Sequence, residues 1–151
     1  MTFYDQLISP RGQALDRYLV RYTGHSLITR VYARRNGIEA LPALLLRSRG
    51  HKTGLWRDAV LPWFYEGGAR VVVGSNGGQP EDPQWVRNLR ACPEAEIFVG
   101  RSLQMVEASF AEGELYQRLW QRVITRVPGY ADYQRACEGQ RQIPLILLTT
   151  V

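Results

Sequence analysis

The residues best suited to chemistry form a short glycine-bracketed segment, Gly50-His51-Lys52-Thr53-Gly54, with Arg57 just beyond it. Lys52 is the only lysine among the 19 basic residues of the chain, and all the others are arginines. Glycines let the backbone turn sharply and approach a ligand closely. Lys52 adds a compact positive charge, and Arg57 adds a planar fork of hydrogen-bond donors. The backbone N–H groups of such a turn can form a concavity that binds an anion. The segment predicts a loop that binds a phosphate or carboxylate, with a solvated hairpin turn as the alternative.

Two common nucleotide-binding motifs do not fit this loop. A nucleoside-triphosphate loop closes a longer glycine run with Gly-Lys-Ser/Thr, whereas here His51 precedes the lysine. No Gly-x-Gly-x-x-Gly follows a predicted strand, so a Rossmann dinucleotide site is not indicated either.

The composition is that of a single globular domain over residues 1–151. Hydrophobic residues make up 45% and charged residues 22% of the chain, and the net charge is +5. Residues 1–75 carry 11 basic and 5 acidic side chains (+6), while residues 76–151 carry 8 and 9 (−1). The positive half contains the glycine loop, which favours an anionic ligand or an anionic membrane surface. Nucleic acid is not an expected partner, because no zinc-finger, RRM-like or KH-like motif is present.

The remaining composition points to a cytoplasmic protein. Cys92 and Cys137 lie far apart and are expected to be reduced thiols, and the two histidines are too far apart to indicate a metal site. The N-terminus lacks the apolar run of a signal peptide. The longest uncharged apolar runs, 40–46 and 143–148, have the length of strands and are too short to cross a bilayer. Peripheral membrane association remains open.

The first 38 residues are expected to form a basic helical segment. The apolar spacing predicts a helix from about Gln13 to Arg35, broken or bent near Gly24. One face of this helix, expected to pack on the core, carries Leu15, Tyr18, Leu19 and Tyr22. The segment also holds six arginines, so docking on a membrane surface is the alternative.

The rest of the chain alternates strands with a few helices. Strands are predicted over residues 41–48, 57–65, 70–75, 95–99, 102–110 and 143–149. A short helix is expected to be capped by Asp82 and to begin at Pro83, and further helices over 112–126 and around Tyr130 and Tyr133. About six strands joined mostly by hairpins indicate an antiparallel barrel rather than a parallel sheet. The predicted fold class is α+β, with a β-barrel core and flanking helices.

Three segments, taken in order, resemble the deazaflavin-dependent nitroreductase and quinone reductase family, which uses coenzyme F420. They are Gly50-His51-Lys52-Thr53-Gly54-x-x-Arg57, then Ser75-Asn76-Gly77-Gly78 with Pro83-x-Trp85-x-x-Asn88-Leu89, and Pro128-Gly129-Tyr130-x-x-Tyr133-Gln134. The resemblance covers about residues 41–148. It implies a split β-barrel that binds reduced F420 and transfers a hydride to a quinone, a nitro compound or an activated alkene.

The resemblance also implies a role for each matched residue. The phosphate side of the cofactor would be held by His51, Lys52, Thr53 and Arg57. The ring system would be lined by Val60, Leu61, Val73, Gly74, Ser75 and Asn76. The short helix would close the pocket with Gln84, Trp85 and Asn88. Tyr130 and Tyr133 would border the substrate, with Tyr130, or alternatively Ser75, donating to the substrate oxygen that gains negative charge.

Several of these residues have simpler interpretations. Trp85 and Leu89 fit the core whatever the function, and Asn88 could brace the loop before Pro93. Tyr130 and Tyr133 could simply cover the end of the barrel.

The chain also departs from the family pattern. The family usually has Arg-x-x-Pro-Leu where this chain has Arg57-Asp58-Ala59-Val60-Leu61, and Asp58 is expected to weaken the hold of Arg57 on an anion. Val127 stands where one branch of the family has a tyrosine, so the choice of substrate is open. The alternatives are an FMN-binding split-barrel reductase, a flavin carrier without turnover, and a peripheral membrane or nucleic-acid binding module.

Overall fold

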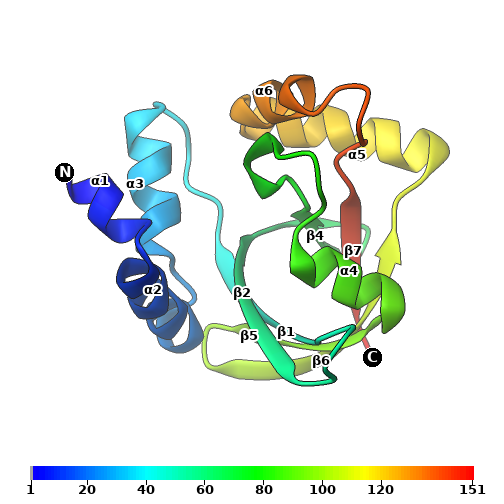
Figure 1. Ribbon diagram of the computed structural model, residues 1–151, viewed down its shortest axis with the longest axis horizontal. Coiled ribbons are helices and arrows are strands. Elements are labelled where there is room, and N and C mark those ends of the chain that lie inside the picture. Colours follow the sequence, from blue (N-terminus) through cyan, green and yellow to red (C-terminus); the bar gives the residue numbers. More distant parts are fainter. Residues whose placement is uncertain (1) are drawn as a thin grey trace.

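The computed structural model describes residues 2–151 as one curled antiparallel sheet flanked by helices (Figure 1). The strand order in the sheet is β2-β1-β5-β6-β7-β4-β3. The strands are β1 (Ala43–Arg49), β2 (Trp56–Pro62), β3 (Phe64–Glu66), β4 (Ala69–Val73), β5 (Glu94–Val99), β6 (Ser102–Phe110) and β7 (Leu145–Thr150). The predicted α+β fold with a split-barrel sheet is confirmed.

The helices cover the outside and the mouth of the curled sheet (Figure 1). The N-terminal helices lie beside β2, α4 packs against the barrel interior, and α5 and α6 lie together at the top of the view in Figure 1. They are α1 (Phe3–Leu7), α2 (Pro10–Thr23), α3 (Leu27–Arg35), the 3-10 turn η1 (Asn76–Gly78), α4 (Gln84–Ala91), α5 (Gly113–Arg126) and α6 (Gly129–Ala136).

The barrel closes at Trp63, where the sequence predicted an unbroken strand over 57–65. The chain leaves β2 at one edge of the sheet and enters β3 at the other edge. At this crossing the Trp63 N–H donates to the carbonyl of Pro42 at 3.0 Å, one step beyond the Ala43–Pro62 pair that ends the β1–β2 ladder. The single predicted strand is therefore two strands, and the sheet has seven strands instead of about six.

Alternation along the strands divides the core into layers on the two faces of the sheet. Leu44 and Leu46 of β1 face the barrel interior, while Ala43 and Leu45 face outward beneath α2. In the same way Ile146 of β7 points inside, and its neighbours contact the α5 side. The side chains of residues 43–46 in β1 are all buried. Truncating one of these leucines to alanine costs about 2–5 kcal/mol of folding free energy.

The N-terminal segment breaks at Gly24 as predicted, but the wrong face was assigned to the core. Gly24 ends α2 with φ of 72°, a left-handed conformation that glycine adopts without strain. The side chains of Leu15, Tyr18 and Tyr22 are 53%, 63% and 43% exposed, whereas Val20 is fully buried against β1. The face of α2 that packs on the core is therefore the one that carries Val20.

Asp16 is also on the buried face, and its partners explain why a carboxylate lies there. It accepts from the Ser26 hydroxyl at 2.6 Å and from the backbone N–H groups of Leu27 and Ile28 at 2.6 and 3.3 Å. These N–H groups open α3 and have no partner within the helix. Asp16 thus fixes α3 against α2, a long-range cap that apolar periodicity does not reveal.

The cap predicted for α4 is also wrong. Pro83, not Asp82, is the N-cap residue, and it makes no side-chain capping hydrogen bond. The Asp82 carboxylate instead accepts from Arg141 at 2.9 Å and Arg90 at 3.3 Å. Asp82 therefore pairs with Arg141, which is distant in the sequence, instead of capping α4.

Within residues 2–151, none of the helices combines the length and the apolar character needed to cross a bilayer. Cys92 and Cys137 are both free thiols.

Candidate active site along strand β2

The glycine loop is a compact turn between β1 and β2. The Gly50 N–H donates to the carbonyl of Leu55 at 2.7 Å, and the Gly54 N–H donates back to the carbonyl of Gly50 at 2.8 Å. Gly54 has a φ of 72°, which a side chain would strain. The Thr53 hydroxyl accepts from the Leu55 N–H at 3.3 Å. The loop is therefore shaped by its own backbone, with its outer face left for a ligand.

Asn88 of α4 ties this loop to the barrel. Its Oδ1 atom accepts from the backbone N–H of His51 at 2.9 Å and lies 2.7 Å from Nδ1 of the same histidine. Its Nδ2 donates to the Ser48 hydroxyl at 3.2 Å, and the Asn88 side chain is almost completely buried. Asn88 braces the glycine loop, not the loop before Pro93 as the simpler interpretation had it.

Four cationic side chains surround the loop, Arg47, Arg49, Lys52 and Arg57, and the first two already have partners within the protein. Arg47 pairs with Asp58 at 3.3 Å and with Glu96 at 3.4 Å. Arg49 donates to the carbonyl of Gly54 at 3.2 Å and lies over the ring of Trp56, 4.1 Å from its centroid.

Lys52 and Arg57 are the two cations that remain available. Within residues 2–151 neither has an ion pair. The expectation that Asp58 weakens Arg57 is wrong, because alternation along β2 sends the two side chains to opposite faces, and Asp58 pairs with its cross-strand neighbour Arg47.

The backbone adds donors to these two charges. In the described chain the N–H groups of Lys52 and Thr53 have no internal acceptor. A hollow of about 360 Å³ opens in front of them. Its lining is Gly50, His51, Lys52, Thr53, Arg57, Gln84 and Asn88. Free amides, two unpaired cations and a concave surface meet here, which is the chemistry of an anion site.

A second hollow of about 450 Å³ follows along β2. It lies between the N-terminal helices and α4, and Figure 1 shows β2 running between these two elements. Val60, Leu61 and Trp85 line it, together with Gln13 and Arg17 from α2. Because β2 is an edge strand, its outer backbone N–H and C=O groups are open to a ligand.

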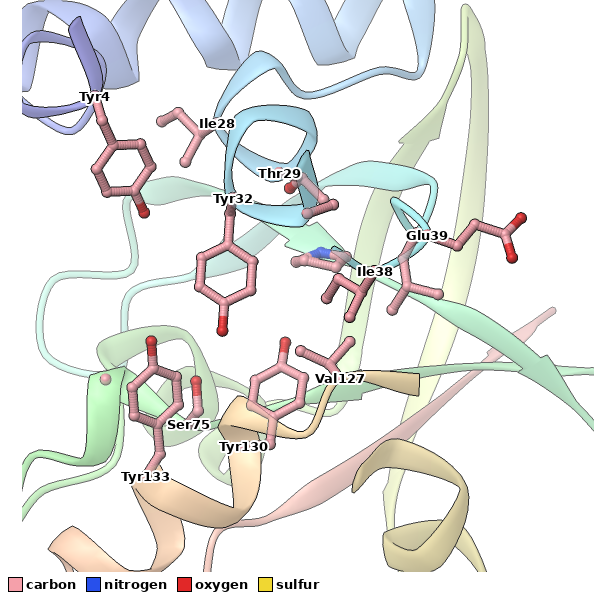
Figure 2. Close-up of a pocket in the computed structure, with 14 residues that line it drawn as sticks. Tyr4, Ile28, Thr29, Tyr32, Ile38, Glu39, Ser75, Val127, Tyr130 and Tyr133 are labelled. Atoms are coloured by element: carbon pink, nitrogen blue, oxygen red, sulfur yellow. The ribbon is translucent and has the colours of Figure 1, made fainter. Parts of the chain in front are cut away.

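The third hollow, of about 230 Å³, is a pocket bordered by four tyrosines. Tyr4 comes from α1, Tyr32 from α3, and Tyr130 and Tyr133 from α6. Figure 2 shows the hydroxyl of each of them directed into the same space, with Ser75 at its floor. This pocket, called the tyrosine pocket below, shares Ile28, Thr29 and Pro62 with the second hollow, so the two adjoin.

The tyrosine hydroxyls keep their protons. Burial, followed by the nearby hydroxyls of Tyr133 and Tyr32, raises the pKa of Tyr130 far above its ordinary value. Burial also raises the pKa of Tyr32 and of Tyr4. At neutral pH these groups are therefore hydrogen-bond donors and not phenolates.

Arg141 holds the strand end that forms the floor of the tyrosine pocket. Its guanidinium donates to the carbonyls of Gly74 at 3.0 Å, Ser75 at 2.6 Å and Gln79 at 2.9 Å, and to Asp82 at 2.9 Å. The side chain is only 10% exposed. Its fork of donors fixes the backbone that carries Ser75.

The site residues named from the sequence fall into three groups along this groove. The first hollow contains His51, Lys52, Thr53, Arg57, Gln84 and Asn88. The second contains Val60, Leu61 and Trp85, and the tyrosine pocket contains Ser75, Tyr130 and Tyr133.

Three other named residues do not line any of these hollows. Val73 packs beside the core under α5, and Asn76 donates to the carbonyl of Glu81 at 2.8 Å. Gly74 is buried, and a Cβ on it would lie 2.7 Å from Pro144 and 2.8 Å from Val86, so it is a packing glycine.

Sequence reasoning missed the contribution of the N-terminal helices. Tyr4, Ile28 and Tyr32 line the tyrosine pocket, and Gln13 and Arg17 line the second hollow. Tyr32 lies within the helix predicted from about Gln13 to Arg35 with no sign of a functional role, and Tyr4 precedes that helix. Nothing in local spacing signals that α1 to α3 fold back over β2.

The comparisons with known proteins agree with this geometry. A model of the F420H(2)-dependent quinone reductase family matches residues 23–150. The chain is 35% identical over 147 residues to F420H(2)-dependent quinone reductase Rv1261c of Mycobacterium tuberculosis (strain ATCC 25618 / H37Rv), covering 89% of this chain and 97% of that one.

Solved structures give the same result. An F420-H2 dependent reductase, FDR-A, is similar with a TM-score of 0.62 at 30% identity, over 71% of this chain and 93% of that one. A chain described as a domain-swapped dimer has a TM-score of 0.62 at 29% identity, over 79% and 95%. Fold, site and sequence together establish that the protein belongs to the F420H(2)-dependent quinone reductase family.

Proposed function

We propose that the three hollows along β2 hold coenzyme F420 and its quinone end to end. The protein is an F420-dependent oxidoreductase that transfers a hydride from the reduced cofactor to a quinone. The observation that carries the placement is the order of the hollows: an anion site at the glycine loop, an apolar groove along β2, and the tyrosine pocket.

The glycine loop fits the anionic part of the cofactor. F420 carries a phosphodiester and an oligoglutamate tail, both negatively charged. Lys52, Arg57 and the free N–H groups of Lys52 and Thr53 supply charge-assisted donors for the phosphodiester. The other arginines near the loop are held by Asp58, Glu96 and Trp56, so the specific contacts come from these two residues.

The middle hollow fits the ring system. Val60 and Leu61 offer apolar contact from β2, and Trp85 closes the other side from α4. When bound, the cofactor supplies the hydride, and the protein contributes position, electrostatics and exclusion of water. The acceptor then occupies the tyrosine pocket next to the ring.

Tyr130 is proposed to donate a hydrogen bond to the acceptor oxygen. As the hydride arrives, the oxygen of the quinone gains negative charge, and a donor fixed beside it lowers the barrier. Because burial raises its pKa, Tyr130 enters the reaction protonated and serves as a hydrogen-bond donor. The quinone therefore takes two electrons and one proton as hydride, and a second proton from water, giving the hydroquinone. Ser75 at the floor and the Tyr133 hydroxyl complete the polar lining of the pocket (Figure 2).

The acceptor is proposed to be neutral and planar. The inner wall of the pocket is apolar, with Ile28, Ile38, Leu41 and Pro62, and Val127 adds another aliphatic side chain where a polar group could have stood. Nitro compounds and activated alkenes share the feature that matters, an oxygen that becomes negative as hydride is added, and belong to the same proposal.

The position of the ring is tested through Trp85. Aromatic contact quenches the emission of a bound deazaflavin excited in its own visible band, where the protein does not absorb. Trp85→Leu is expected to restore much of that emission and to weaken cofactor binding. Trp120→Leu, on α5 away from the groove, is the control and leaves both unchanged. Equal emission and affinity for Trp85→Leu and wild type would remove the ring from the middle hollow.

We propose in addition that α2 contacts an anionic membrane surface. Leu15, Tyr18 and Tyr22 share one exposed face of α2, and Arg11 lies on the same face one turn earlier. An exposed apolar stripe with arginines is typical of an interfacial helix. Quinones with apolar tails dissolve in bilayers, so a protein that acts on them gains from contact with the surface.

Vesicle flotation tests the membrane contact. Binding to phosphatidylcholine vesicles that contain phosphatidylserine is expected, and weaker binding to phosphatidylcholine alone. A Leu15→Ser, Tyr18→Ser, Tyr22→Ser variant should lose it while still reducing a water-soluble quinone. A variant that floats as well as wild type would end this part of the proposal.

A further inference from the structure

We infer that Tyr32 is a second residue in contact with the acceptor, and that its hydroxyl donates to the same oxygen as Tyr130. The inference rests on the hydride-transfer site proposed above and adds a donor from α3. None of the three sequence segments that resemble the family contains this residue.

The geometry places the Tyr32 hydroxyl against the first turn of α6. A Cβ built on Gly129 would lie 2.4 Å from the Tyr32 hydroxyl oxygen and 3.7 Å from its Cζ. Gly129 precedes Tyr130 directly, so the ring of Tyr32 reaches across the pocket to the residue beside the proposed donor. Figure 2 shows the hydroxyls of Tyr32 and Tyr130 directed toward each other from α3 and α6.

The chemistry of the two hydroxyls is matched. Burial and the hydroxyls of Tyr133 and Tyr4 raise the pKa of Tyr32, and burial and its neighbours raise that of Tyr130. Both groups are therefore protonated donors at neutral pH. Two fixed donors aimed at one oxygen stabilise the negative charge that it gains as hydride arrives, as in an oxyanion hole. Neither donor gives up its proton, so the balance of the reaction is unchanged.

The α3 side of the pocket also restricts the acceptor. Ile28 and Ile38 give apolar contacts on the same side as Tyr32, and the exposed Glu39 stands at the rim. A carboxylate at the mouth repels an anionic acceptor. The site therefore favours a neutral ring with a carbonyl oxygen that fits between α3 and α6, and disfavours quinones that carry a carboxylate or sulfonate.

The functional test compares Tyr32→Phe with Tyr65→Phe, using reduced F420 and a neutral naphthoquinone. Tyr32→Phe should lower kcat and kcat/KM together by about tenfold, with the cofactor dissociation constant within about twofold of wild type. Tyr65→Phe removes an exposed hydroxyl on β3 that lines none of the three hollows, and should change neither. Retention of kcat/KM within about twofold in Tyr32→Phe would overturn the inference.

The geometry has its own test that needs no cofactor. Gly129→Ala should lower Tm in the wild-type background because its Cβ meets the Tyr32 oxygen. In the Tyr32→Phe background this oxygen is absent, and the same substitution should leave Tm unchanged or raise it, since alanine favours a helix. An equal loss of Tm in both backgrounds would show that Tyr32 does not lie on Gly129.

The two failures can be told apart. Wild-type protein that does not oxidise reduced F420 with any quinone contradicts the hydride-transfer site itself. Wild-type turnover with an unaffected Tyr32→Phe variant contradicts only the role of Tyr32.

Discussion

Both the imidazole Nδ1 and the backbone N–H of His51 meet a single atom, Oδ1 of Asn88, at 2.7 and 2.9 Å. Because this oxygen is an acceptor, Nδ1 carries the proton in the assigned tautomer. Asn88 is buried on α4 and also holds Ser48 of β1. One amide side chain thus connects the anion loop, the helix that closes the groove and the first strand of the barrel.

Asn88→Ala should therefore reduce both stability and cofactor affinity. The loss leaves the buried Ser48 hydroxyl and the His51 N–H without this partner, which costs about 1–3 kcal/mol of unfolding free energy. Urea denaturation and cofactor titration are the measurements. Asn36→Ala, at an exposed helix end, is the control and should leave affinity unchanged. Normal cofactor affinity in a destabilised Asn88→Ala protein would mean that the loop does not need its brace.

Tyr130→Phe should slow turnover without changing the site in other respects. The ring and its edge contact with Tyr133, at 6.1 Å between centroids, are kept. Loss of one donor to a developing oxyanion should lower kcat and kcat/KM by about tenfold or more. The measurements are steady-state rates with a quinone and with an enone, and the Tm of each protein. Wild-type rates with both acceptors would leave Tyr130 a role in shape alone.

Stability should fall at alkaline pH because of buried tyrosines. Burial raises the pKa of Tyr116 from 10.0 to about 12, and its hydroxyl donates to the carbonyl of Ile143 at 2.7 Å. Between pH 10 and 12 the unfolded chain loses this proton before the folded protein does, so unfolding becomes more favourable as pH rises. The slope is up to about 1.4 kcal/mol per pH unit for one such group.

Urea denaturation at pH 9, 10 and 11 measures this effect. Tyr116→Phe should be less stable at pH 9, where it lacks the hydrogen bond, and should show a shallower decline above pH 10. Parallel pH profiles for the two proteins would show that Tyr116 does not contribute to the decline.

Arg141→Lys should loosen the floor of the tyrosine pocket. A lysine keeps the positive charge beside Asp82, but its single ammonium cannot reproduce the four contacts of the guanidinium, so backbone carbonyls of the floor lose their donors. Because Asp82 is partly exposed, the cost should be about 2–3 kcal/mol, below that of a fully buried pair. Arg135→Lys, in an exposed pair with Asp132, should cost almost nothing by comparison. Similar unfolding free energies for the two variants would contradict the role of Arg141.

The elements that sequence reasoning placed correctly are those set by local rules. The hairpin of β5 and β6 and the break at Gly24 depend on alternation and turn chemistry. The assignments that failed depend on distant partners. Asp82 was taken for a cap because its arginine partner is 59 residues away, and Asp16 is buried because it caps a later helix.

The candidate site likewise contains residues that local sequence patterns reveal and residues that only long-range packing brings together. The glycine loop, Ser75, Tyr130 and Tyr133 belong to recognisable segments. Tyr32 and Tyr4 reach the pocket only because α1 to α3 pack over β2, and no local pattern specifies that packing.

The most direct test of the account is a comparison of ligands at Lys52. F420 and its riboside without the phosphate share the deazaflavin ring, so the difference in their dissociation constants isolates the anion site. Wild-type protein should bind F420 more tightly than the riboside and more tightly than FMN. Lys52→Ala should weaken F420 about ten- to hundredfold, the value of one charge-assisted contact, and leave the riboside unchanged. An equal loss for both ligands, or tighter binding of FMN than of F420, would contradict the placement of the cofactor along β2.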